Sequence, residues 1–188
     1  MAINTLKLLL NASIIEYHND TGGLTKYSLR ETDKIATLKT VNLVNVPSDS
    51  IFLQLDNIDT ATLFIGKKSN GLYENTRCDY LIIEDDNIYF IELKSHENAP
   101  VKKKSECIGK FSASLCLIKY IDEVISVVRK QTKIFEHKNI YYILMYQNIP
   151  IDKTGTSLKS QKQHNCPDKF LAIPVANNGD LYFRELLG

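Results

Sequence analysis

Three charged residues stand at the open end of a predicted β-hairpin, Asp79 on its first strand (residues 77–84) and Glu92 with Lys94 on its second (residues 87–95). Both runs are strongly apolar, and charges buried among apolar side chains are costly unless they are paired or bind a metal. Carboxylates on neighbouring strands repel each other, so a divalent cation between them would relieve this cost. Oxygen ligands suit Mg²⁺, with Mn²⁺ expected to substitute. Such an ion polarises phosphoryl oxygens and acidifies bound water, which is the chemistry of phosphodiester hydrolysis.

The hairpin loop decides where the first carboxylate points. Glu92 and Lys94 are two residues apart, so their side chains share one face of the strand. If residues 85–86 form the loop, Asp79 falls opposite Glu92, and if residues 86–87 form it, Asp79 falls opposite Lys94. Either loop brings the three charges to one face, whereas a loop of one or three residues sends Asp79 to the other.

Asp79, followed at hairpin distance by Glu92-Leu93-Lys94, resembles the motif of the PD-(D/E)XK nuclease superfamily. The resemblance implies an α/β protein with a restriction-endonuclease-like core, a central mixed β-sheet flanked by helices, over about residues 50–147. It implies that Asp79 and Glu92 bind the metal, that the backbone carbonyl of Leu93 completes the ligand set, and that Lys94 is the catalytic lysine.

The same resemblance implies further site residues. Many members carry another acid on a first helix, and Glu16, on a predicted helix over residues 3–17, is the first candidate for this metal ligand. Glu74, shortly before the hairpin, is its competitor. Many members also carry polar side chains on the helix after the lysine, where Lys110 and Ser114 stand, so both are expected to bind nucleic acid.

Hydrophobic periodicity predicts the elements that position these residues. Apolar side chains recur at three- and four-residue steps over residues 104–130, which is typical of a helix. The other predictions are strands at 35–46, 51–55, 61–65 and 139–146 and a C-terminal hairpin at 170–187. No linker or repeat divides the chain, so one nuclease-like domain is expected over residues 1–188.

Composition limits the class of protein. The chain has 188 residues, and its 23 basic and 22 acidic side chains give a net charge of +1, so any anion binding must come from local clusters. No apolar run reaches the roughly 20 residues that span a bilayer. The four cysteines form no CxxC pair and are expected to be reduced, which favours a cytoplasmic protein without a membrane anchor.

Basic clusters near the motif are candidates for phosphate contacts: Lys67, Lys68, Lys102, Lys103 and Lys104. The sequence therefore predicts a Mg²⁺-dependent endonuclease acting on DNA, in restriction, anti-phage defence or repair. Two alternatives stay open, an RNA-cleaving nuclease of the same fold and a non-catalytic nucleic-acid-binding or assembly module. Because no target-recognition region is evident, three arrangements are expected as alternatives: a weakly specific enzyme, an enzyme with a partner protein that supplies specificity, or a homodimer whose two copies cooperate.

Overall fold

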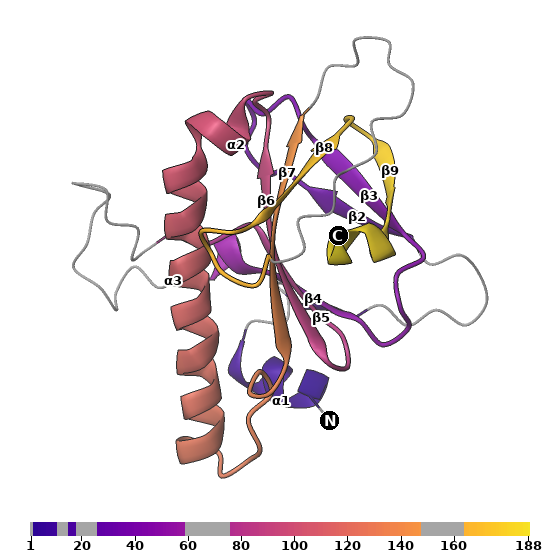
Figure 1. The fold of residues 1–188 in the computed structure, drawn as a ribbon. Helices are drawn as coiled ribbons and strands as arrows, with labels where there is room; N and C mark the ends of the chain where they lie inside the picture. The colour runs from indigo at the N-terminus through magenta and orange to yellow at the C-terminus, as the bar shows by residue number, and fades with distance from the viewer. Residues whose placement is uncertain (1, 11–14, 18–25, 59–75, 148–163) are drawn as a thin grey trace.

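A computed structural model describes residues 2–10, 15–17, 26–58, 76–147 and 164–188. Its centre is a six-stranded sheet in the order β1-β4-β5-β6-β7-β8 (Figure 1). The first three pairings are antiparallel and the last two are parallel. The strands are β1 (Ile15–Tyr17), β4 (Ile51–Gln54), β5 (Tyr80–Ile83), β6 (Asn87–Lys94), β7 (Asn139–Gln147) and β8 (Leu171–Val175).

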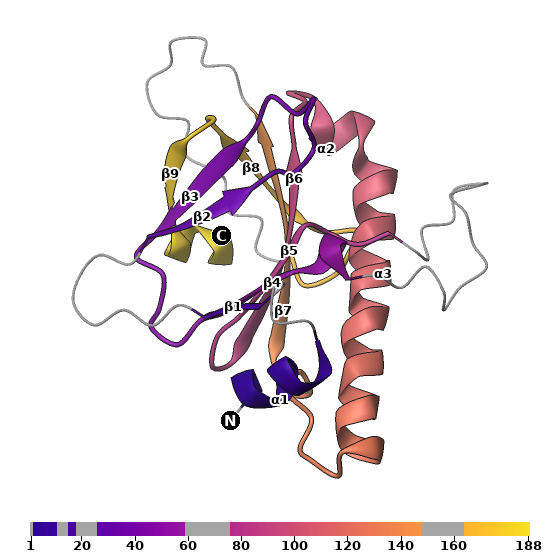
Figure 2. The same cartoon turned by 180° about the vertical axis from the view of Figure 1, so that it is seen from behind.

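A long helical crossover joins the central parallel strands. After β6 the chain forms α2 (Ala99–Lys102) and α3 (Lys104–Glu123), and a π-helical turn (Val124–Val128) extends α3. Parallel strands need such a crossover, because the chain must return to the edge at which the first strand began. α3 runs along one face of the sheet, and α1 (Ala2–Leu9) lies near the far end of this crossover (Figures 1 and 2).

A smaller sheet covers the opposite face. It has the order β2-β3-β9, from β2 (Lys26–Arg30), β3 (Thr40–Val44) and β9 (Gly179–Tyr182), and the 3-10 helix η4 (Phe183–Leu187) follows it. β2 and β3 pair antiparallel, and β3 and β9 pair parallel. The protein is therefore α/β, with two mixed sheets, and the central sheet is buried on both faces.

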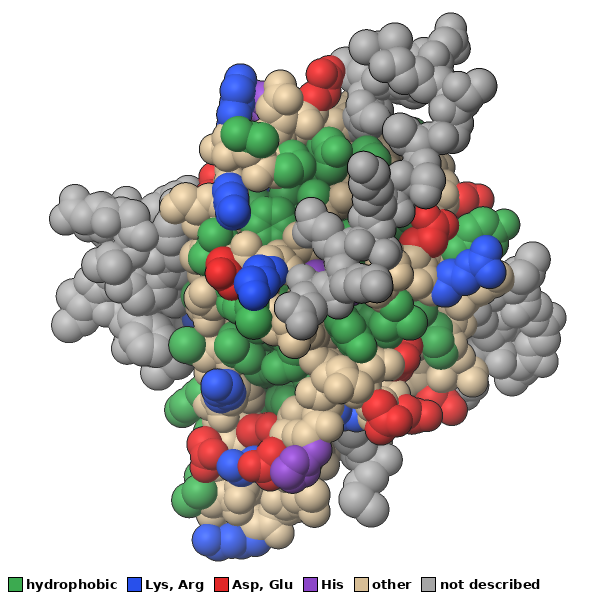
Figure 3. Space-filling view, in the orientation of Figure 1, with side chains coloured by type: hydrophobic (Ala, Val, Ile, Leu, Met, Phe, Trp, Pro, Cys, Tyr) green, Lys and Arg blue, Asp and Glu red, His purple; other side chains and the backbone are tan. Residues whose placement is uncertain are grey.

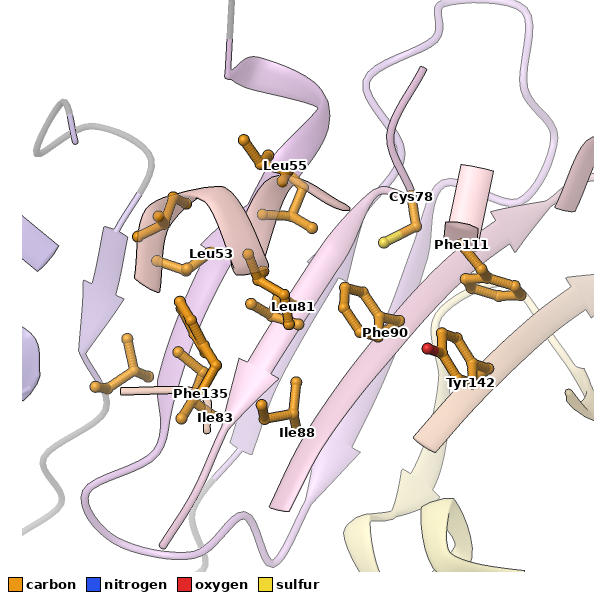
Figure 4. Close-up of a cluster of buried hydrophobic side chains, with 14 of the residues drawn as sticks. Leu53, Leu55, Cys78, Leu81, Ile83, Ile88, Phe90, Phe111, Phe135 and Tyr142 are labelled. Atoms are coloured by element: carbon orange, nitrogen blue, oxygen red, sulfur yellow. The ribbon is translucent and has the colours of Figure 1, made fainter. Parts of the chain in front are cut away.

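Burial on both faces explains the nearly continuous apolar strands. Alternate side chains of β5 and β6 enter two separate cores, one beneath α3 and one beneath the smaller sheet. In the first core Phe90 stacks on Tyr142 at 5.2 Å between ring centroids, and Phe111 of α3 packs edge-on against Tyr142 at 5.4 Å (Figure 4). The charged motif lies at the end of this first core.

Two sequence predictions about the chain ends are wrong. The N-terminal helix stops at Leu9, and residues 15–17 form a strand on the edge of the central sheet, so the helix does not extend over 3–17. Residues 170–187 do not form a hairpin, because β8 pairs with β7 whereas β9 pairs with β3 in the other sheet. The alternating pattern identified the strands but not their partners.

Candidate functional site

The hairpin register brings the two carboxylates opposite each other. Tyr80 pairs with Ile91, and the Glu84 amide donates to the Asn87 carbonyl at 3.0 Å, so residues 85–86 form the loop. One step beyond Tyr80, this register puts Asp79 opposite Glu92. The first of the two predicted registers is therefore confirmed, and both carboxylates lie on the face that α3 covers.

Hydrogen bonds from two directions hold Asp79, which is 7% exposed. Its Oδ2 accepts the Leu93 amide at 2.6 Å. The backbone amide of Cys78, the residue before Asp79, donates to the Ser114 hydroxyl at 2.9 Å. This hydroxyl in turn donates to the Lys110 carbonyl at 2.8 Å. Ser114 is fully buried and thus fastens α3 to the start of β5, so it is not placed to contact a nucleic acid as predicted.

Glu92 is fully buried, and its two oxygens have different surroundings. Oε1 lies 2.7 Å from the Lys94 ammonium and 2.6 Å from the Lys110 ammonium. Oε2 is buried and has no hydrogen-bond partner in the described part of the chain. An unpartnered buried carboxylate oxygen costs free energy, so a ligand at this atom would be favourable, as it would at Oε2 of Glu84, which also lacks a partner among the described residues.

The electrostatics of the pair follow from burial and from the neighbouring charges. Burial, and after it the charge of Glu92, raise the pKa of Asp79 well above its usual range. Burial by itself would lower the pKa of Lys110, but the charges of Glu92 and Asp79 outweigh it and raise the pKa. Lys110 therefore stays protonated, and the ionised form of Asp79 is disfavoured wherever no further positive charge is present.

Lys94 belongs to a second set of ion pairs at the mouth of the site. Its ammonium also contacts Glu106 of α3 at 2.9 Å, and Glu106 in turn pairs with Lys103 at 3.0 Å. Although burial alone would raise the pKa of Glu106, hydrogen bonds from Lys94 and Lys103 lower it to about 2. Lys94 is thus held in place on both sides by carboxylates.

Sequence reasoning missed Glu106 and Asp56. Asp56, in the 3-10 turn η2 (Leu55–Asn57), follows a residue whose amide donates to the Asp79 carbonyl at 3.0 Å. Desolvation, and after it the charge of Glu31, raise the pKa of Asp56, while Lys110 lowers it. The pairing of β4 with β5 could have indicated this acid, because it carries the chain after β4 to the start of β5.

The predicted third acid is not among the acids seen at the site. Glu16 lies on β1 and not on a helix, and its side chain is outside the described structure. Glu74 and the predicted strand at 61–65 fall outside the described residues. The role of each glutamate as a metal ligand stays a prediction.

Three residues of the predicted basic clusters are described, and they lie at the start of the crossover. Lys102 and Lys104 are exposed at the start of the crossover, whereas Lys103 pairs with Glu106. On the face shown in Figure 3 the coloured Lys and Arg side chains are scattered. Lys67 and Lys68 lie outside the described residues.

The oxygen atoms at this site provide part of the ligand set of one hard cation. Two carboxylates and a peptide carbonyl are oxygen ligands of the kind that Mg²⁺ takes, usually together with several waters, and the Oε2 atom of Glu92 is available. Among the described residues, no three His, Cys, Asp or Glu side chains stand together as a metal cluster. The fit therefore depends on Asp79, Glu92 and water.

Family models, curated proteins and solved structures, when compared with this chain, give no match. None of the helices in the described ranges is both long and apolar enough to cross a bilayer.

Proposed function

We propose that the protein is a metal-dependent nuclease that hydrolyses phosphodiester bonds in DNA. The observation that carries the proposal is the buried pair of Asp79 and Glu92 on adjacent strands, with one carboxylate oxygen unpartnered and Lys94 on the same face. A buried pair of acids that serves folding alone would be expected to have every oxygen satisfied. The unpartnered oxygen is what a cation site needs.

The order of elements supports the restriction-endonuclease-like part of the proposal. β4, β5 and β6 form an antiparallel meander, α3 crosses over, and β7 adds parallel to β6. This is the strand, strand, strand, helix, strand order that the motif resemblance implies. It also puts the motif at the end of β6, covered by the crossover helix.

Each residue then has a distinct role. Asp79, Glu92 and the Leu93 carbonyl would hold Mg²⁺, or Mn²⁺ in its place, which supplies a polarised phosphoryl oxygen and an acidified water. The Leu93 amide, by bonding Asp79, fixes the angle of that carboxylate. The Lys94 ammonium, held by Glu106, would orient the attacking water and stabilise the charge that develops on the phosphoryl oxygens.

A second candidate function is a non-catalytic nucleic-acid-binding module. One observation favours it: Lys94 and Lys110 both contact Glu92 Oε1, as in a charge-neutral cluster whose role is structural. A structural cluster does not require the unpartnered Oε2 atom, and for this reason we put catalysis first.

A cleavage assay separates the two candidates. Supercoiled plasmid DNA, and an RNA of the same sequence, are incubated with the protein in Mg²⁺, Mn²⁺ or EDTA. Glu92→Gln and Lys94→Met are expected to lower cleavage of DNA by at least about 10³-fold, since the first removes a ligand of the metal and the second removes the ammonium that stabilises transition-state charge. Glu97→Gln, which alters an exposed carboxylate nearby, is the matched control and should cleave normally.

Each outcome has a defined reading. Cleavage that survives EDTA or Glu92→Gln would remove the assigned site. DNA binding without cleavage in either metal would favour the non-catalytic module, and cleavage of RNA alone would correct the substrate. Circular dichroism of each variant establishes that loss of cleavage is not loss of folding.

A further inference from the structure

Lys110 of α3 reaches across to the two carboxylates on the sheet. Its ammonium lies 2.6 Å from Glu92 Oε1 and 3.7 Å from Asp79 Oδ1, and its side chain is 18% exposed. It thus contacts both of the acids that would hold a divalent ion. The ammonium of Lys110 therefore occupies the position between two carboxylates that a small cation would also take.

The ammonium groups of the cluster already match its carboxyl groups in number without a metal. Its ion pairs join three carboxylates, Asp79, Glu92 and Glu106, to three ammonium groups. A divalent ion added to this set would leave an excess of two positive charges in a partly buried site even with Asp79 ionised, which is unfavourable at short range. One ammonium should therefore leave when the ion enters.

The contacts distinguish which ammonium leaves. Lys94 contacts Glu106 as well as Glu92, so it keeps a partner if Glu92 is taken by the ion. Lys110, within the described residues, has ion pairs only with the two proposed ligands of the ion, Glu92 and Asp79. Its partial exposure also gives its long side chain a path to solvent.

We propose that Lys110 is a resident competitor of the divalent ion: its ammonium occupies the carboxylate pair in the metal-free protein and is displaced when the ion binds. This inference rests on the proposed function, because it concerns the same metal site. It assigns to Lys110 a role in setting the affinity for metal, where the sequence predicted contact with nucleic acid.

Metal binding tests the competition directly. Mn²⁺ is titrated into the metal-free protein by isothermal calorimetry, and free Mn²⁺ is followed by electron paramagnetic resonance. Lys110→Met removes the competing charge and should lower the Kd for Mn²⁺ at least about 10-fold, whereas Lys110→Arg keeps the charge and should stay within about 3-fold of wild type. Lys103→Met, which removes one charge from the same cluster at the outer Glu106, is the control for general charge and should change the Kd less than about 3-fold.

The readout distinguishes competition from a structural role. If Lys110 only supported the fold, its loss would loosen the site and weaken binding, so tighter binding has no structural explanation. Lys110→Gln provides a second neutral variant. If either variant is unfolded without metal, recovery of its circular dichroism on addition of Mn²⁺ supports the competition, and failure to recover counts against it.

The two proposals fail in different ways. Equal or weaker Mn²⁺ binding by Lys110→Met and Lys110→Gln, with wild type binding normally, overturns the competition and leaves the nuclease proposal standing. No Mn²⁺ binding by wild type or any variant, at concentrations up to several times the roughly 1 mM Kd of weak divalent sites, overturns both. If Lys110→Met and Lys110→Gln bind Mn²⁺ and wild type does not, the competition is supported in its strongest form.

Discussion

The two faces of the central sheet are built from the same strands but differ in charge. On the face beneath the smaller sheet, β5 and β6 present apolar or aromatic side chains along their whole length: Tyr80, Ile82, Tyr89, Ile91 and Leu93. On the α3 face the same strands present Leu81, Ile83, Ile88 and Phe90, and then two buried carboxylates at the open end of the hairpin.

This contrast indicates that burial of the hairpin does not require charged side chains. The opposite face shows that this hairpin can be buried against a partner by apolar contacts and hydrogen bonds between neutral groups, without buried charges. Buried ion pairs of this kind are often no more stabilising than apolar side chains of similar volume. The α3 face thus carries a cost that the opposite face avoids, and the proposed metal site would account for it.

Making the α3 face resemble the opposite face gives the largest expected effect. Glu92→Met or Lys110→Met alone should lower the free energy of unfolding by about 3–5 kcal/mol in metal-free buffer, because each leaves a buried charge short of a partner. The double variant should recover most of this loss, since Lys94 retains Glu106, and it should not cleave DNA. Urea denaturation measures the free energy of unfolding of the three variants. If the loss in the double variant equals the sum of the losses in the two single variants, the Glu92–Lys110 ion pair is not a cost to the fold.

Ser114 offers the next effect, because it links the charged end of this face to α3. Ser114→Ala leaves the buried Cys78 amide without its acceptor, which should cost about 1–3 kcal/mol of stability. Since Asp79 is then held less firmly, DNA cleavage should fall about 10- to 100-fold. Ser112→Ala, at a half-buried serine of the same helix, is the control. Equal effects of the two serines on cleavage would contradict the link.

The parts of the fold set by local pattern could be predicted from the sequence. The predicted strand at 51–55, the hairpin with its two-residue loop, and the long helix were confirmed, because alternation, turn residues and helical spacing act over short distances. Counting from the loop then left two registers, of which the structure has the first. The pairing of β8 and β9 with different sheets could not be predicted, because it depends on contacts with β3 and β7 far along the chain.

In the candidate site, too, only the residues that a local pattern brings together could be predicted. Asp79, Glu92 and Lys94 come together because they lie on one hairpin. Lys110 and Glu106 reach the site from α3, and nothing in their spacing indicates which carboxylate or ammonium they meet. Such partners depend on how the helix packs on the sheet, which is a tertiary property.

Glu106 provides a smaller effect, through pH. Its pKa in the folded protein, about 2, lies below the ordinary value of 4.5, so its contribution is present above pH 4.5 and is lost as the pH falls toward 2. Glu106→Gln should lower stability at pH 7 by about 1–2 kcal/mol, allowing for solvent screening, and should flatten the profile between pH 4.5 and 2. Glu123→Gln, at an exposed ion pair of the same helix, should change stability by less than about 0.5 kcal/mol. An unchanged profile in Glu106→Gln would show that Lys94 and Lys103 do not depress this pKa.

Tyr80 gives the smallest effect and tests the uncharged face. Its hydroxyl donates to the Arg30 carbonyl and accepts the Arg30 amide, both at 2.8 Å, and so joins the central sheet to β2. Tyr80→Phe should cost only about 1 kcal/mol, because the bonds are between neutral groups. Cleavage should be unchanged, since the hydroxyl lies on the face away from Asp79 and Glu92. Tyr182→Phe, at an exposed tyrosine of β9, is the control. If Tyr80→Phe lowered cleavage as much as Ser114→Ala, the two faces would not be independent, and the assignment of chemistry to the α3 face alone would be wrong.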